Sequence, residues 1–265
     1  MKTGAKLLIS ALLAPAAVCL VPTAAASAGA QGGLLVPGVA ISDAEFEVGA
    51  WCRYLVRDEY LGESDSTSIY IAVTAKTRGK KGSAWWVEVE SGRYGALPEE
   101  REVVKLLISE GIRDLVPGDS LCGYVEALYI RRDDGRVEKG DPCSLDRLTL
   151  TNPTSDSDWT VTRGETVDTP AGRFVSDRKH LAAEDKREIH MGRHKLIKND
   201  TDVFDVWLSD KVPIFRLVRC TVSRVRDSRT VPPIPGIPDK GREESRTTAE
   251  LVGFGHGASP LMAIE

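Results

Sequence analysis

Strand patterns follow one another along most of this chain without alternating helices, and this succession restricts the fold to an antiparallel β architecture. Apolar and polar side chains alternate in residues 50–58, 68–77 and 84–90, as they do in strands with one buried face. The turns between these stretches are short, so they are expected to pair as an antiparallel meander. The same alternation recurs in 121–132 and from 159 to 254, which gives about ten strands in all.

One segment, residues 98–110, carries the pattern of a helix. Pro98 suits a first helical turn, and Gly111 is positioned to end the helix. The apolar side chains from Val103 to Ile108 form a broad stripe that needs a sheet to cover it. We therefore expect a mainly β fold, in which a strongly curved antiparallel sheet packs around one main covering helix.

Residues 1–30 have the pattern of a secretory signal peptide. Lys2 and Lys6 precede an apolar run from residue 7 to residue 21, and small residues follow. The candidate cleavage sites lie at Ala26, Ala28 and Ala30. The sequence thus predicts export to a periplasm or to the medium.

The rest of the chain is predicted to form a flexible leader over 31–43 and a single β-rich domain over 44–265. No later apolar run reaches the ~18 residues that a spanning helix needs, so no transmembrane segment is expected. The precursor has a net charge of −4, and loss of the two signal-peptide lysines leaves about −6. A mildly acidic chain without a basic face is not expected to bind nucleic acid.

Four cysteines remain after signal removal, and an even number in an oxidising compartment predicts two disulfides. We favour the pair closest in sequence, Cys122–Cys143, which leaves Cys52–Cys220. Free buried thiols are the alternative. The sequence contains no C-x-x-C, so neither a thioredoxin-like nor a zinc-ribbon site is expected.

Two stretches in the C-terminal half each read as strand, turn and strand. In residues 166–180, Pro170 fixes its own φ and Gly172 can take the positive φ of a tight turn. In residues 204–219, a strand at 206–208 is followed by a turn and by a strand expected from Val212 onward. Residues 182–202 between them are charged, and either short strands or a surface excursion fits their pattern.

These two stretches resemble the hairpins of the LolA/LolB-like lipoprotein-carrier superfamily of secreted bacterial proteins. Residues that match its first hairpin are Val167, Thr169, Pro170, Ala171, Gly172 and Phe174, and those that match its second are Trp207, Ser209, Val212, Pro213, Leu217 and Val218. The resemblance implies an open half-barrel whose concave face holds apolar side chains and a helix. It also implies that this face holds a lipid or a lipoprotein acyl chain, or docks an envelope partner.

The aromatic residues on predicted strands, with the apolar stripe facing them, are the candidate lining of that face. We take as candidate ligand-binding residues Trp85, Leu106, Leu107, Trp207 and Phe215. A cavity remains among them only if the sheet does not close over its helix, and otherwise the same side chains form the core.

Enzymatic motifs are incomplete, and we expect a non-enzymatic protein without a cofactor or a metal ion. The alternative is a GDSL-type esterase that uses Ser120 with Asp177 and His180, since Gly118-Asp-Ser-Leu and Asp177-x-x-His180 match parts of that signature. Against it, Ser120 follows a Pro-Gly turn that opens a strand. A purely structural interaction module in the envelope is a further alternative.

Overall fold

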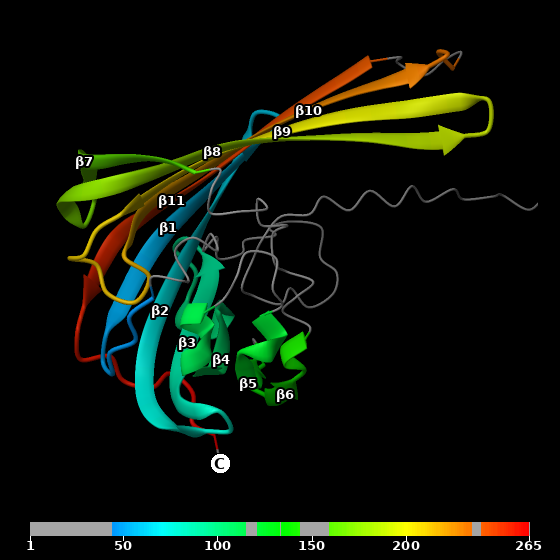
Figure 1. The fold of residues 1–265 in the computed structure, drawn as a ribbon. Coiled ribbons are helices and arrows are strands. Elements are labelled where there is room, and N and C mark those ends of the chain that lie inside the picture. Colours follow the sequence, from blue (N-terminus) through cyan, green and yellow to red (C-terminus); the bar gives the residue numbers. More distant parts are fainter. Residues whose placement is uncertain (1–43, 115–120, 133, 144–158, 235–239, 265) are drawn as a thin grey trace, which may run out of the picture.

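The computed structural model describes residues 44–114, 121–132, 134–143, 159–234 and 240–264 (Figure 1). The predicted signal peptide, the leader and Ser120 lie outside them. The regular structure of these described residues consists of eleven strands and three short 3₁₀ helices, namely β1 (Trp51–Tyr60), β2 (Glu63–Gly79), β3 (Gly82–Arg93), η1 (Pro98–Glu100), β4 (Glu102–Ser109), η2 (Glu110–Asp114), η3 (Leu121–Gly123), β5 (Val125–Arg131), β6 (Val137–Gly140), β7 (Thr160–Thr169), β8 (Gly172–Met191), β9 (His194–Leu208), β10 (Leu217–Val231) and β11 (Lys240–Gly255).

All eleven strands belong to one antiparallel sheet, in the order β6-β5-β4-β3-β2-β1-β11-β10-β9-β8-β7. Two meanders, β1–β6 and β7–β11, are joined where β1 pairs with β11. The end strands β6 and β7 do not pair with each other, so the sheet is open. The mainly β, antiparallel and unclosed architecture predicted from the sequence is confirmed.

The meander β1–β5 presents one continuous apolar face. Its register aligns Cys52, Ile71, Val89, Val104 and Ile130 in a row across the five strands, and all of them are buried. Side chains two residues apart on a strand share a face, so neighbouring rows add to the same surface. Such a face is stable only if another part of the chain removes it from water.

Two segments without regular structure, residues 44–50 and 209–216, help to cover this face. The Phe46 ring lies 5.4 Å from the Trp85 ring and 6.2 Å from the Phe215 ring, in an edge-on arrangement with the latter. All three aromatic side chains are buried within the same apolar cluster. Ring pairs at these separations add a favourable contact beyond the area that they bury.

One hydrogen bond joins the two covering segments, and a second holds the start of β10, which follows them. The Glu45 amide donates to the Ile214 carbonyl at 2.8 Å, and the buried Tyr54 hydroxyl donates to the Leu217 carbonyl at 3.1 Å. Ile214 and Arg216 have φ angles of 69° and 58°, a region that side chains other than glycine rarely occupy. Because Ile214 is completely buried, its packing offsets the cost of that conformation.

The expected helix over 98–110 is wrong. A single 3₁₀ turn, Pro98–Glu100, precedes strand β4, and the described residues contain no α-helix. Val103 and Val104 are adjacent and point to opposite faces of the sheet, yet both are completely buried. A strand covered on both faces needs a continuous apolar run, and this run looks like the stripe of a buried helix.

Both C-terminal hairpin stretches form as expected, with one shift. Gly172 has a φ of 132° in the turn between β7 and β8. After β9 ends at Leu208, the chain crosses the apolar face before β10 begins at Leu217 rather than at Val212. The charged residues 182–202 belong to a long hairpin that β8 and β9 form, so these strands are longer than the short strands expected.

If Phe215 closes the apolar face, then Phe215→Ala should lower the free energy of unfolding by about 3–5 kcal/mol in urea denaturation, as for other buried aromatic residues. Val175→Ala provides the control, because this β8 side chain is 62% exposed. The control should cost about 1 kcal/mol or less. Equal losses in the two variants would contradict a closing role for Phe215.

Candidate functional site

Three of the five candidate ligand-binding residues lie together in the core. Trp85 and Phe215 meet around Phe46, and Leu106 belongs to the same buried cluster. All four are at most 7% exposed, and the chain's own covering segments pack against them. In this structure these residues therefore serve as core.

The other two candidates lie elsewhere. Leu107 points away from Leu106 because successive side chains alternate along β4. Trp207 is half-buried on β9, and its indole Nε1 donates to a Glu165 carboxylate oxygen at 2.8 Å. The five residues thus do not line one common surface.

Arginine side chains from the two neighbouring strands lie close to the Trp207 ring. The guanidinium carbons of Arg178 and Arg219 lie 5.4 Å and 5.9 Å from the ring centroid, within the range of cation–π attraction. Arg219 also forms an ion pair with Glu250 at 2.7 Å. Asp205 accepts a hydrogen bond from Arg178 at 2.8 Å, and this bond raises the pKa of the Arg178 guanidinium. The charged side chains around Trp207 are therefore mostly paired with one another.

The structure also separates the residues of the esterase alternative. Asp177 accepts a hydrogen bond from the Gly164 amide at 3.2 Å, whereas His180 Nδ1 lies 2.8 Å from Asp205. Asp177 and His180 are three residues apart on β8, so their side chains point to opposite faces. Ser120 lies outside the described residues. Asp177 and His180 do not form the Asp–His pair that this alternative requires.

The most distinctive feature of the molecule is a four-stranded extension of the sheet, which we call the projecting ribbon. Figure 1 shows β8, β9, β10 and β11 reaching beyond the rest of the sheet. The projecting ribbon comprises residues 182–191, 194–203, 222–231 and 240–248. Nearly all of these residues are exposed or half-exposed, so no core lies behind either face.

Cross-strand ion pairs join β9 and β10 within the projecting ribbon. Arg224 pairs with Asp202 at 2.6 Å and Arg226 pairs with Asp200 at 2.8 Å, each through two hydrogen bonds. The hydrogen bond to Asp200 raises the pKa of Arg226. Burial pushes the pKa of Asp200 upward, but the hydrogen bond and charge of Arg226 outweigh burial and lower it. Both groups are therefore charged at neutral pH.

The long edges of the projecting ribbon are open within the described part of the chain. β7 pairs with β8 only as far as His180, so the outer edge of residues 182–191 has no neighbouring described strand. β1 pairs with β11 only as far as Ser245, which leaves residues 240–244 paired on one side alone. Apolar side chains are also exposed toward the tip, where Ile189 is 43% exposed.

A groove of about 510 Å³ lies where the β1–β2 turn meets the projecting ribbon. Tyr60 and Leu61 line it from the turn, and Arg224, Ser245 and Arg246 line it from the ribbon. It is an open surface groove, and it does not overlap the buried aromatic cluster.

The projecting ribbon was not predicted from the sequence. The pattern that indicates it lies in residues 182–202, where charged side chains are frequent on both sides of a central glycine. Gly192, with a φ of 61°, forms the turn between the two strands. A two-sided polar pattern around a turn glycine is typical of a hairpin exposed on both faces.

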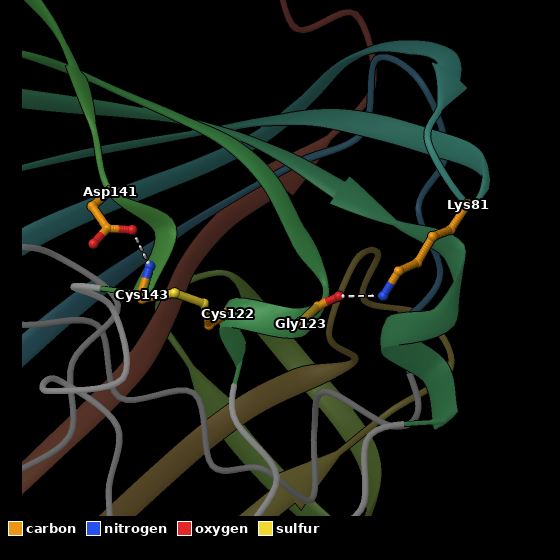
Figure 2. Close-up of a disulfide and its surroundings, with 5 residues drawn as sticks. All are labelled: Lys81, Cys122, Gly123, Asp141 and Cys143. Atoms are coloured by element: carbon orange, nitrogen blue, oxygen red, sulfur yellow. Dashed lines mark hydrogen bonds between the residues drawn. A yellow bond between two sulfur atoms is a disulfide. The ribbon is translucent and has the colours of Figure 1, made fainter.

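The four cysteines among the described residues divide into one disulfide and two thiols. Cys122 and Cys143 form the disulfide, which ties η3 to the segment after β6 (Figure 2). Next to it, Lys81 donates to the Gly123 carbonyl at 3.0 Å. The expected Cys52–Cys220 disulfide is wrong, because both cysteines are free thiols. Cys52 lies opposite Phe254 of β11, whereas Cys220 lies opposite Ala249, five residues away along the same strand.

The described residues contain no group of three or more histidine, cysteine, aspartate or glutamate residues that could hold a metal ion. They also contain no helix that is long and apolar enough to cross a membrane.

Comparisons with known proteins identify no family. No protein-family model matches the chain, and no curated protein matches it. Among solved structures, a lipoprotein candidate from Parabacteroides distasonis is similar, with 12% identity, a TM-score of 0.33 and coverage of 79% of this chain and 96% of that chain. An exported-protein candidate with a YmcC-like fold from Bacteroides fragilis has 8% identity, a TM-score of 0.32 and the same two coverages.

These likenesses are too loose to carry an argument about function. They also do not identify the chain with the LolA/LolB-like superfamily, which stays a prediction from the hairpin residues. The assignment of a function therefore depends on the geometry of the chain itself.

Burial should make both free thiols unreactive in the folded protein. Burial raises the pKa of Cys52 to about 12 and that of Cys220 to about 12, so neither forms the reactive thiolate at pH 8. Iodoacetamide labelling followed by peptide mass spectrometry should leave both unmodified in the native state and modify both in urea. Labelling of either one in the native state at the rate of a cysteine-containing peptide would contradict this burial.

Proposed function

We propose that this chain is a non-enzymatic protein that works outside the cytoplasm and binds a protein partner of the cell envelope through the projecting ribbon. The observation that carries the proposal is the ribbon itself, a long extension with two solvent-exposed faces and open edges. The apolar cluster that stabilises the sheet does not need this extension, because nearly all of the cluster lies outside it. An element that contributes little to the core is available for binding.

Two observations support a location outside the cytoplasm. The Cys122–Cys143 disulfide is of a kind that persists in oxidising compartments and is rare in the cytosol. The pattern of residues 1–30 predicts a secretory signal peptide. A periplasmic or secreted protein accounts for both.

Strand addition is the mode of binding that the ribbon favours. An open strand edge presents unpaired backbone amides and carbonyls, which an extended segment of a partner can pair with. Residues 184–188 of the β8 edge read Glu-Asp-Lys-Arg-Glu, so charges of both signs lie along it. Charged side chains at an edge oppose indiscriminate pairing between copies. We therefore expect the partner strand to carry charges complementary to this edge.

A bound lipid or acyl chain in the concave face has less support. The aromatic residues expected to line that site are packed against Phe46 and other side chains of the chain itself. Binding there would require the covering segments 44–50 and 209–216 to move away. The partner-binding proposal requires no such change.

Photo-crosslinking in cells that naturally export the protein would test this proposal. Lys186, exposed on the ribbon part of β8, is replaced by p-benzoylphenylalanine. The matched control places the same photoreactive group at Val175, which is 62% exposed on the same strand but outside the ribbon. We expect a discrete protein adduct from position 186 and none from position 175, since position 186 lies on the open edge of the ribbon, whereas position 175 pairs with Thr166 of β7.

Mass spectrometry of the adduct would then identify the partner segment. Adducts of equal strength from both positions, or from neither, would contradict binding through the ribbon.

A further inference from the structure

The C-terminal segment of the chain is bound by side chains of the sheet instead of forming a strand. After β11 ends at Gly255, residues 256–264 have no regular structure. The Ala258 amide donates to the Gly49 carbonyl at 2.9 Å, and the segment then passes over the face of β3, β4 and β5 on which Glu88, Lys105 and Arg131 lie. Leu261 and Met262 are the residues held there.

Three charged side chains, Glu88, Lys105 and Arg131, hold the backbone of these two residues. Glu88 Oε2 accepts the Leu261 amide at 2.5 Å, and an Arg131 guanidinium nitrogen donates to the Leu261 carbonyl at 2.9 Å. Lys105 Nζ donates to the Met262 carbonyl at 2.8 Å. These hydrogen bonds all go to backbone amide and carbonyl groups, which every peptide has. We call Glu88, Lys105 and Arg131 the backbone clamp.

The register of the sheet builds this clamp. Glu88 on β3 pairs with Lys105 on β4, and Arg131 lies on β5 opposite Val103. The three charged side chains therefore project from the same face of neighbouring strands. Glu88 and Lys105 also form an ion pair at 2.9 Å.

Burial makes the clamp more than a chance surface contact. The Glu88 side chain is completely buried and that of Lys105 is 10% exposed. Removing two charges from water costs several kcal/mol each, and apolar residues of similar size would cover this face at lower cost. A charge pair at this position is favourable when polar groups of a ligand complete its hydrogen bonds.

An apolar component accompanies the charges. The Met262 side chain is only 2% exposed, although its neighbour Ala263 is exposed. Beside the clamp, Lys105 Nζ lies 5.6 Å from the centre of the Trp86 ring, and Trp86 lies 6.2 Å from the Tyr129 ring. The site thus combines recognition of the backbone with burial of one apolar side chain.

We propose that the backbone clamp is a peptide-binding site, and that residues 258–264 are its ligand supplied in cis. Its ligand class is an extended peptide with an apolar residue at the position of Met262, whose side chain the site buries. The site lies on β3–β5, away from the projecting ribbon, so it does not depend on the function proposed above. Because the segment is tethered, its effective concentration at the clamp is in the ~millimolar range, and a free peptide cannot displace it. A competing peptide is therefore tested after the tether is cut.

The test begins with a chain that ends at Gly257 and a fluorescein-labelled peptide of residues 258–265. Fluorescence anisotropy should show saturable binding to the shortened protein and none to the full chain, where the native segment occupies the clamp. A second peptide, N-methylated at Leu261, lacks the donor that Glu88 accepts and should bind on the order of 10- to 100-fold more weakly. N-methylation at the exposed Ala263 provides the matched control and should change the affinity little.

A second format covers the case in which the shortened chain does not fold. A protease site inserted after Gly257 allows the segment to be cut once the full chain has folded. Exchange of the cut segment for excess labelled peptide supports the proposal. Retention of the cut segment against excess peptide, or equal affinity of the Leu261-methylated and unmethylated peptides, would overturn it.

Discussion

Burial of a single apolar sheet face is the constraint on which the rest of this structure depends. The sheet of eleven described strands is not closed, and the described residues contain no α-helix to cover it. The contacts of Phe46 with Trp85 and Phe215 meet that need, since they bring two irregular segments onto β1–β5. The register of the sheet, the long connection before β10 and the positive φ of Ile214 all serve that covering.

Charged side chains make the main contacts in the parts of the sheet that lie outside the apolar core. Over β3–β5, the opposite face of the sheet is covered by the C-terminal segment, which Glu88, Lys105 and Arg131 hold through its backbone. In the projecting ribbon, cross-strand arginine–aspartate pairs replace a core altogether. The molecule therefore consists of a body with two covered faces over β3–β5 and an extension with none. This division is the physical basis for assigning partner binding to the extension.

Local patterns in the sequence predicted much of this fold. Alternation placed Cys52, Tyr54 and Val56 on one face of β1, and the structure buries all three. Propensity and periodicity could not reveal that β4 is covered on both faces, because one of its covers comes from residues 261–262, far along the chain. The same limit applies to Cys52 and Cys220, whose separation is set by the register of β11. The burial of Trp85, Leu106 and Phe215 could not be predicted for a related reason, since the segments that cover them carry no regular pattern.

Amide hydrogen exchange measured by mass spectrometry tests the division between the covered body and the uncovered ribbon most directly. Amides of β4 should exchange only with global unfolding, because both faces and both edges of this strand are covered. Amides of residues 182–191 should exchange much faster through local opening, since neither face is buried and one edge is open among the described strands. Exchange from residues 182–191 as slow as that from β4 would contradict an uncovered ribbon and remove the basis for binding there.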